Sequence, residues 1–188
     1  MAGALDGFRV IDFGQYIAGP LVGMLMADQG ADVIKVDPPG GPRWKTPANA
    51  TWNRGKRSIR LDLKSQEGKD IFWKLVETAD VVVENNRKGA LDRMGFSWQR
   101  IQEINPRMIY ASVKGFGPGP YKDCKVYENV AQCAGGSAST TGEIGSIPLV
   151  TGSQIGDSGT GMHLVAGILA AQAIRDAGIP LPFALEVI

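Results

Sequence analysis

Four short apolar segments rich in β-branched residues constrain the fold of this chain more than any other feature. They begin at Phe8 (FRVIDF), Ala31 (ADVIKV), Asp80 (DVVVE) and Met108 (MIYASV). Each is nearly continuous in hydrophobicity, which is typical of a strand that is covered on both faces. Strands that alternate with helical patterns favour a parallel sheet with helices on both sides.

Helical patterns fill the intervals between these strands. The first, IAGPLVGMLMADQGA, has Pro20 at a position suited to a first helical turn and Gly30 at a position suited to a C-terminal cap. The second begins at Ser65 and places one apolar face on the helix, formed by Ile71, Phe72, Leu75 and Val76. The sequence therefore predicts an α/β fold with a doubly wound, mostly parallel, Rossmann-like sheet.

Two stretches do not follow this alternation of strands and helices. DPPGGPRWKTPANATWNRGKRS, from Asp37, is rich in Pro and Gly and predicts a long loop after the second strand, where open α/β sheets gather their ligands. The tail, AGIPLPFALEVI from Ala177, contains two prolines that cannot continue a preceding helix. We expect a domain over residues 1–175 and a divergent C-terminal tail over 176–188.

Composition excludes several classes of protein. The chain has 188 residues, a formal net charge of +1 and 44% hydrophobic residues, which indicates one globular domain without a general attraction to nucleic acid or membranes. Cys124 and Cys133 form no CxxC pair and are interpreted as reduced thiols. The sequence predicts neither a signal peptide nor a membrane-spanning segment, so a cytoplasmic location is expected.

Common catalytic motifs are missing from the sequence. No GxGxxG follows the first strand, and no P-loop, metal-ligand cluster or Ser/His/Asp order is present. The one histidine, His163, is interpreted as a packed residue on a helix. These observations argue against a kinase and against a dinucleotide-dependent dehydrogenase, and no metal is expected.

Basic residues gather in the segment NRGKRSIRLDLK, from Asn53. They are Arg54, Lys56, Arg57, Arg60 and Lys64. They fit either a solvated surface or a phosphate-binding rim, because Lys and Arg pair with phosphate through charge-assisted hydrogen bonds. Arg87 and Arg93 follow the third strand, where the carboxyl edge of the sheet is expected.

Asp157 lies among glycines and small hydroxyl residues, in GDSGTGMHL, just before an apolar helix. Asp is a preferred N-cap, so helix capping explains it locally. Alternatively, Gly156, Gly159 and Gly161 leave the carboxylate unshielded, and a carboxylate next to a helix N-terminus can serve as a nucleophile towards an activated acyl group. Local chemistry leaves both interpretations open.

Several segments together resemble the class III CoA-transferases, and most closely their formyl-CoA transferase branch. The resemblance rests on GFRVIDFGQYIAGP, LMADQGADVIKVDPP, NRGKRSIRLDLKSQEGK, the stretch from ADVVVENNRKGALDRMGF to YASVKGFG, KVYENVAQCAGGSASTTG and GDSGTGMHLVAGILAA. Their order and spacing match nearly continuously from about Leu5 to about Ala173.

The resemblance implies a catalytic residue and a binding site. Asp157 would be the nucleophile that attacks an acyl-CoA thioester, and coenzyme A would be the acyl carrier, with a small carboxylic acid as acceptor. The residues implied to contact coenzyme A are Ile17, Ala18, Leu61, Asp62, Leu63, Lys64, Asn85, Asn86, Arg87, Arg93, Lys125, Val126 and Tyr127.

The chain departs from the family pattern at single positions. Ile17 replaces a glutamine of the substrate site, Pro38 replaces an arginine at the coenzyme A end, and Asn86 replaces an aromatic residue. The racemase branch has a histidine where this chain has Val126, which argues against racemisation.

The chain also departs from the family in length. Family members are roughly twice as long and carry a second, smaller domain, and two such chains interlock. We therefore expect the N-terminal half of the enzyme, a homo-oligomer, and a tail in which the resemblance ends near Ile174. The alternative is a truncated, non-catalytic module that binds coenzyme A or only self-associates.

Overall fold

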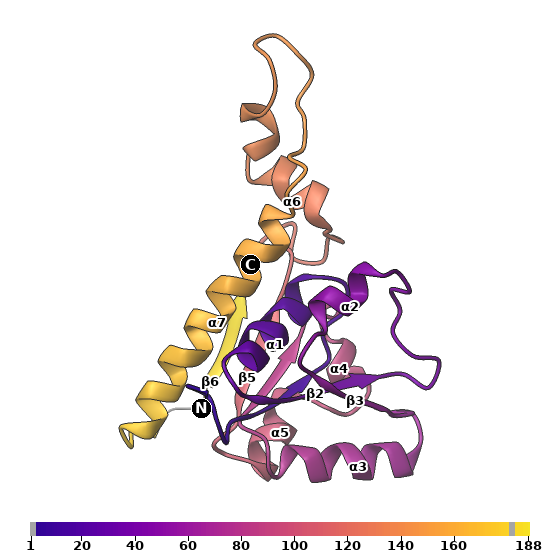
Figure 1. The fold of residues 1–188 in the computed structure, drawn as a ribbon, viewed down its shortest axis with the longest axis vertical. Helices are drawn as coiled ribbons and strands as arrows, with labels where there is room; N and C mark the ends of the chain where they lie inside the picture. Colours follow the sequence, from indigo (N-terminus) through magenta and orange to yellow (C-terminus); the bar gives the residue numbers. More distant parts are fainter. Residues whose placement is uncertain (1–2, 181–182) are drawn as a thin grey trace.

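The structure is a computed structural model that describes residues 3–180 and 183–188. Its elements are β1 (Arg9–Asp12), α1 (Ala18–Asp28), β2 (Asp32–Asp37), α2 (Ala48–Trp52), β3 (Arg57–Arg60), α3 (Gln66–Val76), β4 (Val81–Glu84), α4 (Ala90–Arg93), α5 (Trp98–Ile104), β5 (Ile109–Val113), α6 (Glu128–Ala134), the 3-10 helix η1 (Ser137–Thr140), α7 (Ile155–Asp176) and β6 (Phe183–Val187). Figure 1 shows their arrangement.

The strands form one six-stranded sheet in the order β3-β2-β1-β4-β5-β6. Every pairing is parallel, including Val10 with Val33 and Val10 with Val81. The central strands are apolar on both faces, and Val81, Val82 and Val83 are completely buried. The predicted doubly wound α/β fold is therefore confirmed.

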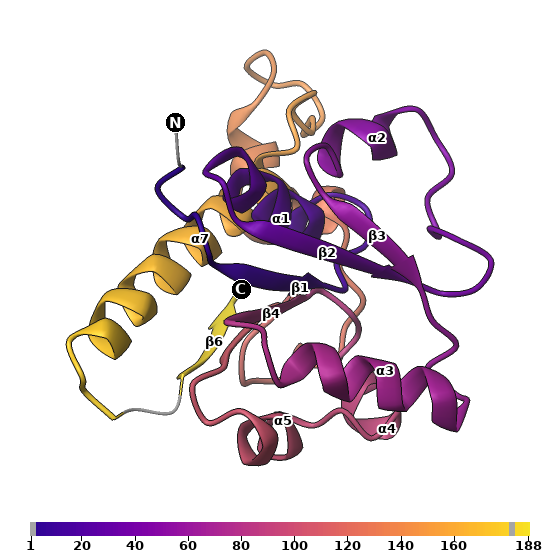
Figure 2. The ribbon, with the colours of Figure 1, turned by 60° about the horizontal axis from the view of Figure 1, so that its bottom comes forward.

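Helices cover both faces of the sheet (Figure 2). On one face, Val22 and Met26 of α1 and Leu164 and Ile168 of α7 pack against inward-facing strand residues such as Val10. On the other face, the core includes Ile11 and Val82 of the strands, Phe72 and Val76 of α3, and Ile101 of α5. Alternate residues of a strand thus supply the two halves of the core.

Two helix ends follow the sequence closely. The hydroxyl of Ser65 accepts a hydrogen bond of 3.1 Å from Gly68 N and so caps α3. After α1, Gly30 adopts a φ of 98° and its N–H donates to Ala27 O at 2.9 Å. A positive φ at this position favours glycine, so the predicted end of the first helix is confirmed.

Three elements differ from the sequence prediction. The segment predicted as one long loop contains α2 and ends in β3. In the tail, Phe183–Val187 form β6, which pairs in parallel with β5 from Ile109 to Val113. The helix before the tail, α7, ends at Asp176, four residues before Pro180. The second proline of the tail, Pro182, lies with Leu181 outside the described residues.

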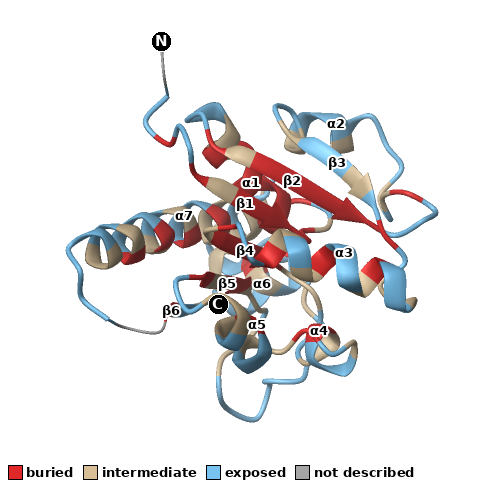
Figure 3. Cartoon of the chain, turned by 90° about the horizontal axis from the view of Figure 1, so that it is seen from below, coloured by how far each residue is buried: buried red, intermediate tan, exposed pale blue. Residues whose placement is uncertain are grey.

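The segment that contains α6 and η1 projects from the body of the molecule, and α7 leads back from it along the sheet (Figure 1). The outer side of α7 is largely exposed, whereas the side towards the sheet is buried (Figure 3). None of the helices in the described ranges has the length and apolarity needed to cross a membrane.

Candidate active site

The candidate residues follow the strands at the carboxyl edge of the sheet. Because all six strands are parallel, their carboxyl ends lie at this one edge. Ile17 and Ala18 follow β1 and start α1, and the segment 61–64 follows β3. Residues 85–87 and Arg93 follow β4, and the segment 125–127 leads from β5 into α6. The structure therefore brings together residues that the sequence separates by more than a hundred positions.

Asp157 lies in the first turn of α7, which packs against α1. The two helices are in close contact at Gly161, where an added Cβ would lie 3.0 Å from Ala18 O and 3.0 Å from Leu21 Cδ2. The helix turn that carries Asp157 is therefore next to the start of α1, where the predicted contacts Ile17 and Ala18 lie.

The N-terminus of α7 is capped by a residue from another helix. Glu128, the first residue of α6, accepts hydrogen bonds from Gly156 N at 2.9 Å and from Asp157 N at 2.7 Å. These N–H groups belong to the first turn and have no partner within the helix. Helix capping by the Asp157 side chain, one of the two interpretations of the sequence, is therefore not what the structure has.

The Asp157 carboxylate remains available for chemistry. Within residues 3–180 and 183–188, it accepts no hydrogen bond and joins no ion pair, and it is half-buried. Burial first, and then the negative charge of Glu128, raise the pKa of Asp157 to about 6. A carboxylate with a raised pKa is more basic, and it is still mostly ionised at neutral pH.

Glu128 itself is held as an anion. Burial acts to raise its pKa, but the N–H groups of Asp157 and Gly156 and the side-chain amide of Gln132 outweigh that effect and lower the pKa below its usual value. Glu128 is not among the residues predicted from the sequence, although it lies inside the KVYENVAQ segment that carries the family resemblance. Only its contact with residues 28 and 29 positions away identifies it.

Three aromatic side chains from distant loops meet at the same edge of the sheet. The ring centroid of Tyr16 lies 5.9 Å from that of Tyr127 and 6.0 Å from that of Trp44. Tyr16 has a φ of 62°, the one positive φ outside glycine in the described chain. Strained backbone of this kind concentrates at functional sites, and neither Tyr16 nor Trp44 was selected from the sequence.

Asn85 connects β4 to the loop after β1. Its side chain accepts a hydrogen bond of 2.7 Å from Gln15 N and donates one of 2.8 Å to Gln15 O. Both of its polar groups are thus engaged with the backbone just before Ile17. Val126 has a comparable local role, because its side chain fills the space where a Cβ of Gly115 would lie.

The basic segment 54–64 divides into paired and unpaired residues. Arg54 pairs with Asp28 at 2.5 Å, Arg57 pairs with Asp32 at 2.6 Å, and the buried Lys56 pairs with Asp12 at 2.7 Å. Three of the five cations therefore already pair with carboxylates of the chain. In the part of the chain that the structure describes, Arg60 and Lys64 join no ion pair, and both are exposed.

The remaining predicted cations are exposed at the carboxyl edge. Lys125 and Arg87 are exposed, and Arg93 reaches back to Lys88 O at 3.4 Å. Exposed Lys and Arg side chains form charge-assisted hydrogen bonds with phosphate groups where these are bound. Among the predicted contacts, Ile17, Ala18 and Leu61 are buried apolar residues that form the base of this edge.

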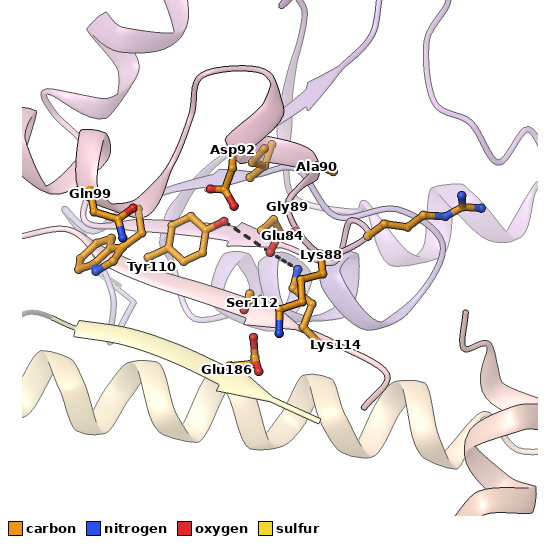
Figure 4. Close-up of a pocket in the computed structure, with 13 residues that line it drawn as sticks. Glu84, Lys88, Gly89, Ala90, Asp92, Gln99, Tyr110, Ser112, Lys114 and Glu186 are labelled. Atoms are coloured by element: carbon orange, nitrogen blue, oxygen red, sulfur yellow. Dashed lines mark hydrogen bonds and ion pairs between the residues drawn. The ribbon is translucent and has the colours of Figure 1, made fainter. Parts of the chain in front are cut away.

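A cavity of about 200 Å³ lies beside β4, β5 and β6 (Figure 4). At its centre the buried Glu84 pairs with Lys114, accepts a 2.7 Å hydrogen bond from Asn86 N and contacts the hydroxyl of Tyr110 at 3.5 Å. Burial raises the pKa of Glu84 above its usual range. The lining includes Arg87 but not Asp157, and the volume is below that of most small-molecule sites.

His163 lies on the exposed side of α7, and its Nδ1 is 2.8 Å from Gly159 O. Its interpretation as a packed residue is therefore wrong. Among the residues for which the structure gives positions, no three His, Cys, Asp or Glu side chains gather as metal ligands do.

Known proteins resemble this chain in sequence. The model of the family described as CoA-transferase family III matches residues 5–178. A formyl-CoA:oxalate CoA-transferase of Rhodopseudomonas palustris is 57% identical over 182 aligned residues, which cover 91% of this chain and 43% of that protein. A protein of the same name from a Bradyrhizobium species is 54% identical with the same coverage. The chain thus spans less than half the length of these relatives.

Solved structures resemble the chain over its whole length. A CAIB/BAIF family protein from Brucella suis has a TM-score of 0.90 and 36% identity, and the match covers 100% of this chain and 53% of that one. A hypothetical protein from Mycobacterium tuberculosis also has a TM-score of 0.90, with 34% identity and coverage of 99% and 54%. The structural likeness therefore continues past Ile174, where the sequence resemblance was expected to end. The chain belongs to CoA-transferase family III.

Proposed function

We propose that this chain is the coenzyme A-binding, aspartate-bearing half of a CoA-transferase that moves coenzyme A between a small acyl-CoA and a carboxylic acid. The observation that carries the proposal is the Asp157 carboxylate, which is half-buried in the first turn of α7 and free of the capping role that Glu128 fills. Its raised pKa, about 6, gives a basic carboxylate that is ionised at pH 7.

The chemistry assigned to Asp157 conserves atoms and charge at each step. Its carboxylate oxygen bonds to the thioester carbonyl carbon, the C–S bond breaks, and the electron pair leaves with sulfur as a thiolate. Asp157 then holds the acyl group as a mixed anhydride, and attack by the thiolate on the Asp157 carbonyl releases the donor acid and leaves an aspartyl thioester. The acceptor carboxylate repeats both steps in reverse and regenerates Asp157.

The assignment of the binding residues rests on their position and charge. Lys64, Arg87, Arg93 and Lys125 are exposed cations near the ends of β3, β4 and β5, so phosphates can pair with them. The N-terminus of α7 is directed towards the same edge, and Glu128 receives the N–H groups of Gly156 and Asp157 there. A cytoplasmic location and a homo-oligomeric state belong to the same proposal.

A second candidate is a non-catalytic module that binds coenzyme A or self-associates. The observation that favours it is the large apolar exposure of the projecting segment, where Ile144 and Ile147 are 107% and 77% exposed. Contiguous exposed apolar surface marks association sites. This candidate predicts coenzyme A binding or association without acyl transfer to Asp157.

Calorimetric titration with coenzyme A, followed by mass spectrometry after incubation with formyl-CoA or another small acyl-CoA, separates the two candidates. The transferase proposal expects saturable binding and an adduct on Asp157 that Asp157→Ala abolishes.

Arg93→Ala is expected to weaken coenzyme A binding by about 1–3 kcal/mol, as for lost hydrogen bonds to a charged group. Arg100→Ala is the control, because Arg100 pairs with Glu103 on the exposed side of α5. Binding without an adduct favours the second candidate, and absent binding contradicts both coenzyme A roles.

A further inference from the structure

Glu128 is the buried group most closely tied to Asp157. It is 7% exposed, and its two carboxylate oxygens receive the N–H groups of consecutive residues, Gly156 to Oε1 at 2.9 Å and Asp157 to Oε2 at 2.7 Å. A bidentate acceptor of this kind fixes both the position and the rotation of the helix turn that carries Asp157.

A second residue fixes Glu128 in turn. The amide nitrogen of Gln132, one turn along α6, donates to Glu128 Oε1 at 2.7 Å and to Ser153 O at 3.2 Å. The amide oxygen of Gln132 accepts from Thr151 N at 2.7 Å. The loop before α7, the start of α7 and α6 are thus joined in one partly buried network, with Glu128 and Gln132 at its buried centre.

Gly156 makes room for this network. A Cβ at Gly156 would lie 3.1 Å from Glu128 Oε2, 3.4 Å from Oε1 and 3.1 Å from Ala131 Cβ. A side chain at this position would therefore press on the Glu128 carboxylate and require it to shift by a few tenths of an ångström. The glycine next to Asp157 is explained by Glu128 and not by access to Asp157 alone.

We propose that Glu128 is a positioning residue for Asp157, which caps α7 in place of Asp157 and keeps the Asp157 carboxylate free as a basic nucleophile. Resting on the proposed function, the assignment adds a second carboxylate whose charge and geometry control the first. Among the described residues, Glu128 of α6 is the charged group that acts on the Asp157 carboxyl group. Where α1 meets α7, four residues further along at Gly161, it presents the uncharged Ala18 O and Leu21. On α7 itself, His163 lies more than one turn away and contacts Gly159 O.

Titration of the Asp157 carboxyl group by carbon-13 NMR tests the proposal without any substrate. The Asp157 signal is assigned from its absence in Asp157→Asn. In the unaltered chain its midpoint is expected near pH 6. In Glu128→Gln, which removes the negative charge at similar volume, the midpoint is expected to fall by about one pH unit, and amide hydrogen exchange at Asp157 is expected to accelerate.

Glu143→Gln, an exposed residue of the same projecting segment, is the matched control and is expected to leave the midpoint unchanged. If Glu128→Gln does not fold, Gly156→Ala provides the second variant, because its Cβ would lie 3.1 Å from Glu128 Oε2 and push the carboxylate by a few tenths of an ångström. Its readout is amide hydrogen exchange at Asp157, which is expected to accelerate. An Asp157 midpoint that is unchanged in Glu128→Gln, or amide exchange that is unchanged in Gly156→Ala, overturns the proposal. Acyl capture by the unaltered chain, measured separately, tests the proposed function, so the two ideas fail independently.

Discussion

At the scale of single residues, Asp157 combines availability for reaction with a cost to stability. In the unfolded chain its pKa is near 3.9, and in the folded chain burial and Glu128 raise it to about 6. The folded state therefore binds the proton more tightly, so protonation stabilises the fold as pH falls from 6 towards 4. Above pH 6 the ionised carboxylate destabilises the fold, as is common for groups kept for function.

Asp157→Asn is accordingly expected to raise the free energy of unfolding at pH 7 by about 1 kcal/mol, with solvent screening of a half-buried group allowed for. The gain should shrink as pH falls through 6 and vanish near pH 4, where the unaltered chain is protonated. Urea denaturation at several pH values measures it. Asp123→Asn, at an exposed position, should show no such gain, and an equal effect in both variants would contradict a special environment for Asp157.

At the scale of elements, the contact between α1 and α7 depends on which glycine faces the partner helix. An added Cβ at Gly161 meets Ala18 O at 3.0 Å, whereas one at Gly159 meets nothing within 4 Å. Both residues lie inside α7, where alanine is intrinsically more favourable than glycine by about 1 kcal/mol.

Gly159→Ala is therefore expected to stabilise the chain by up to about 1 kcal/mol, whereas Gly161→Ala is expected to destabilise it by about 1–2 kcal/mol, because a backbone carbonyl cannot move aside as a side chain can. Thermal or urea unfolding of the two variants gives the comparison. Equal effects of the two substitutions would show that α7 does not pack on α1 through Gly161.

The elements differ in how far their sequences predict them. The four central strands are predictable because each is apolar on both faces. β3 is not predicted from the sequence, because RSIR is an edge strand with exposed Arg57 and Arg60 and therefore lacks an apolar run. β6 is not predicted either, because it follows two prolines and because the alternation of buried and exposed residues in FALEV covers only a few positions.

The same difference applies to the candidate site. Asp157 is recognisable from its neighbours in sequence and from the family segments. Glu128 is not, since its role depends on a contact between α6 and α7 that no spacing rule predicts. Tyr16 and Trp44 meet only because two loops converge at one edge of the sheet. Local sequence therefore indicates the reacting group, and tertiary structure identifies what positions it.

At the scale of the whole molecule, α7 presents an apolar stripe to solvent. Ile155, Met162 and Leu169 are 42%, 62% and 41% exposed, and their spacing of seven residues places them on one face of the helix. Figure 3 shows this outer side of α7 as largely exposed. Since exposed apolar surface of this extent favours association, the chain is expected to form oligomers through α7 in solution.

Substitution of both Met162 and Leu169 by lysine is expected to lower the oligomer mass measured by sedimentation. Association through this face would bury two new positive charges, which is unfavourable. Ile71→Lys serves as the control, since Ile71 is 40% exposed on α3, which covers the opposite face of the sheet. The control should keep the mass of the unaltered chain. If the double variant keeps it too, association does not use this face of α7, and the projecting segment with Ile144 and Ile147 becomes the surface to substitute next.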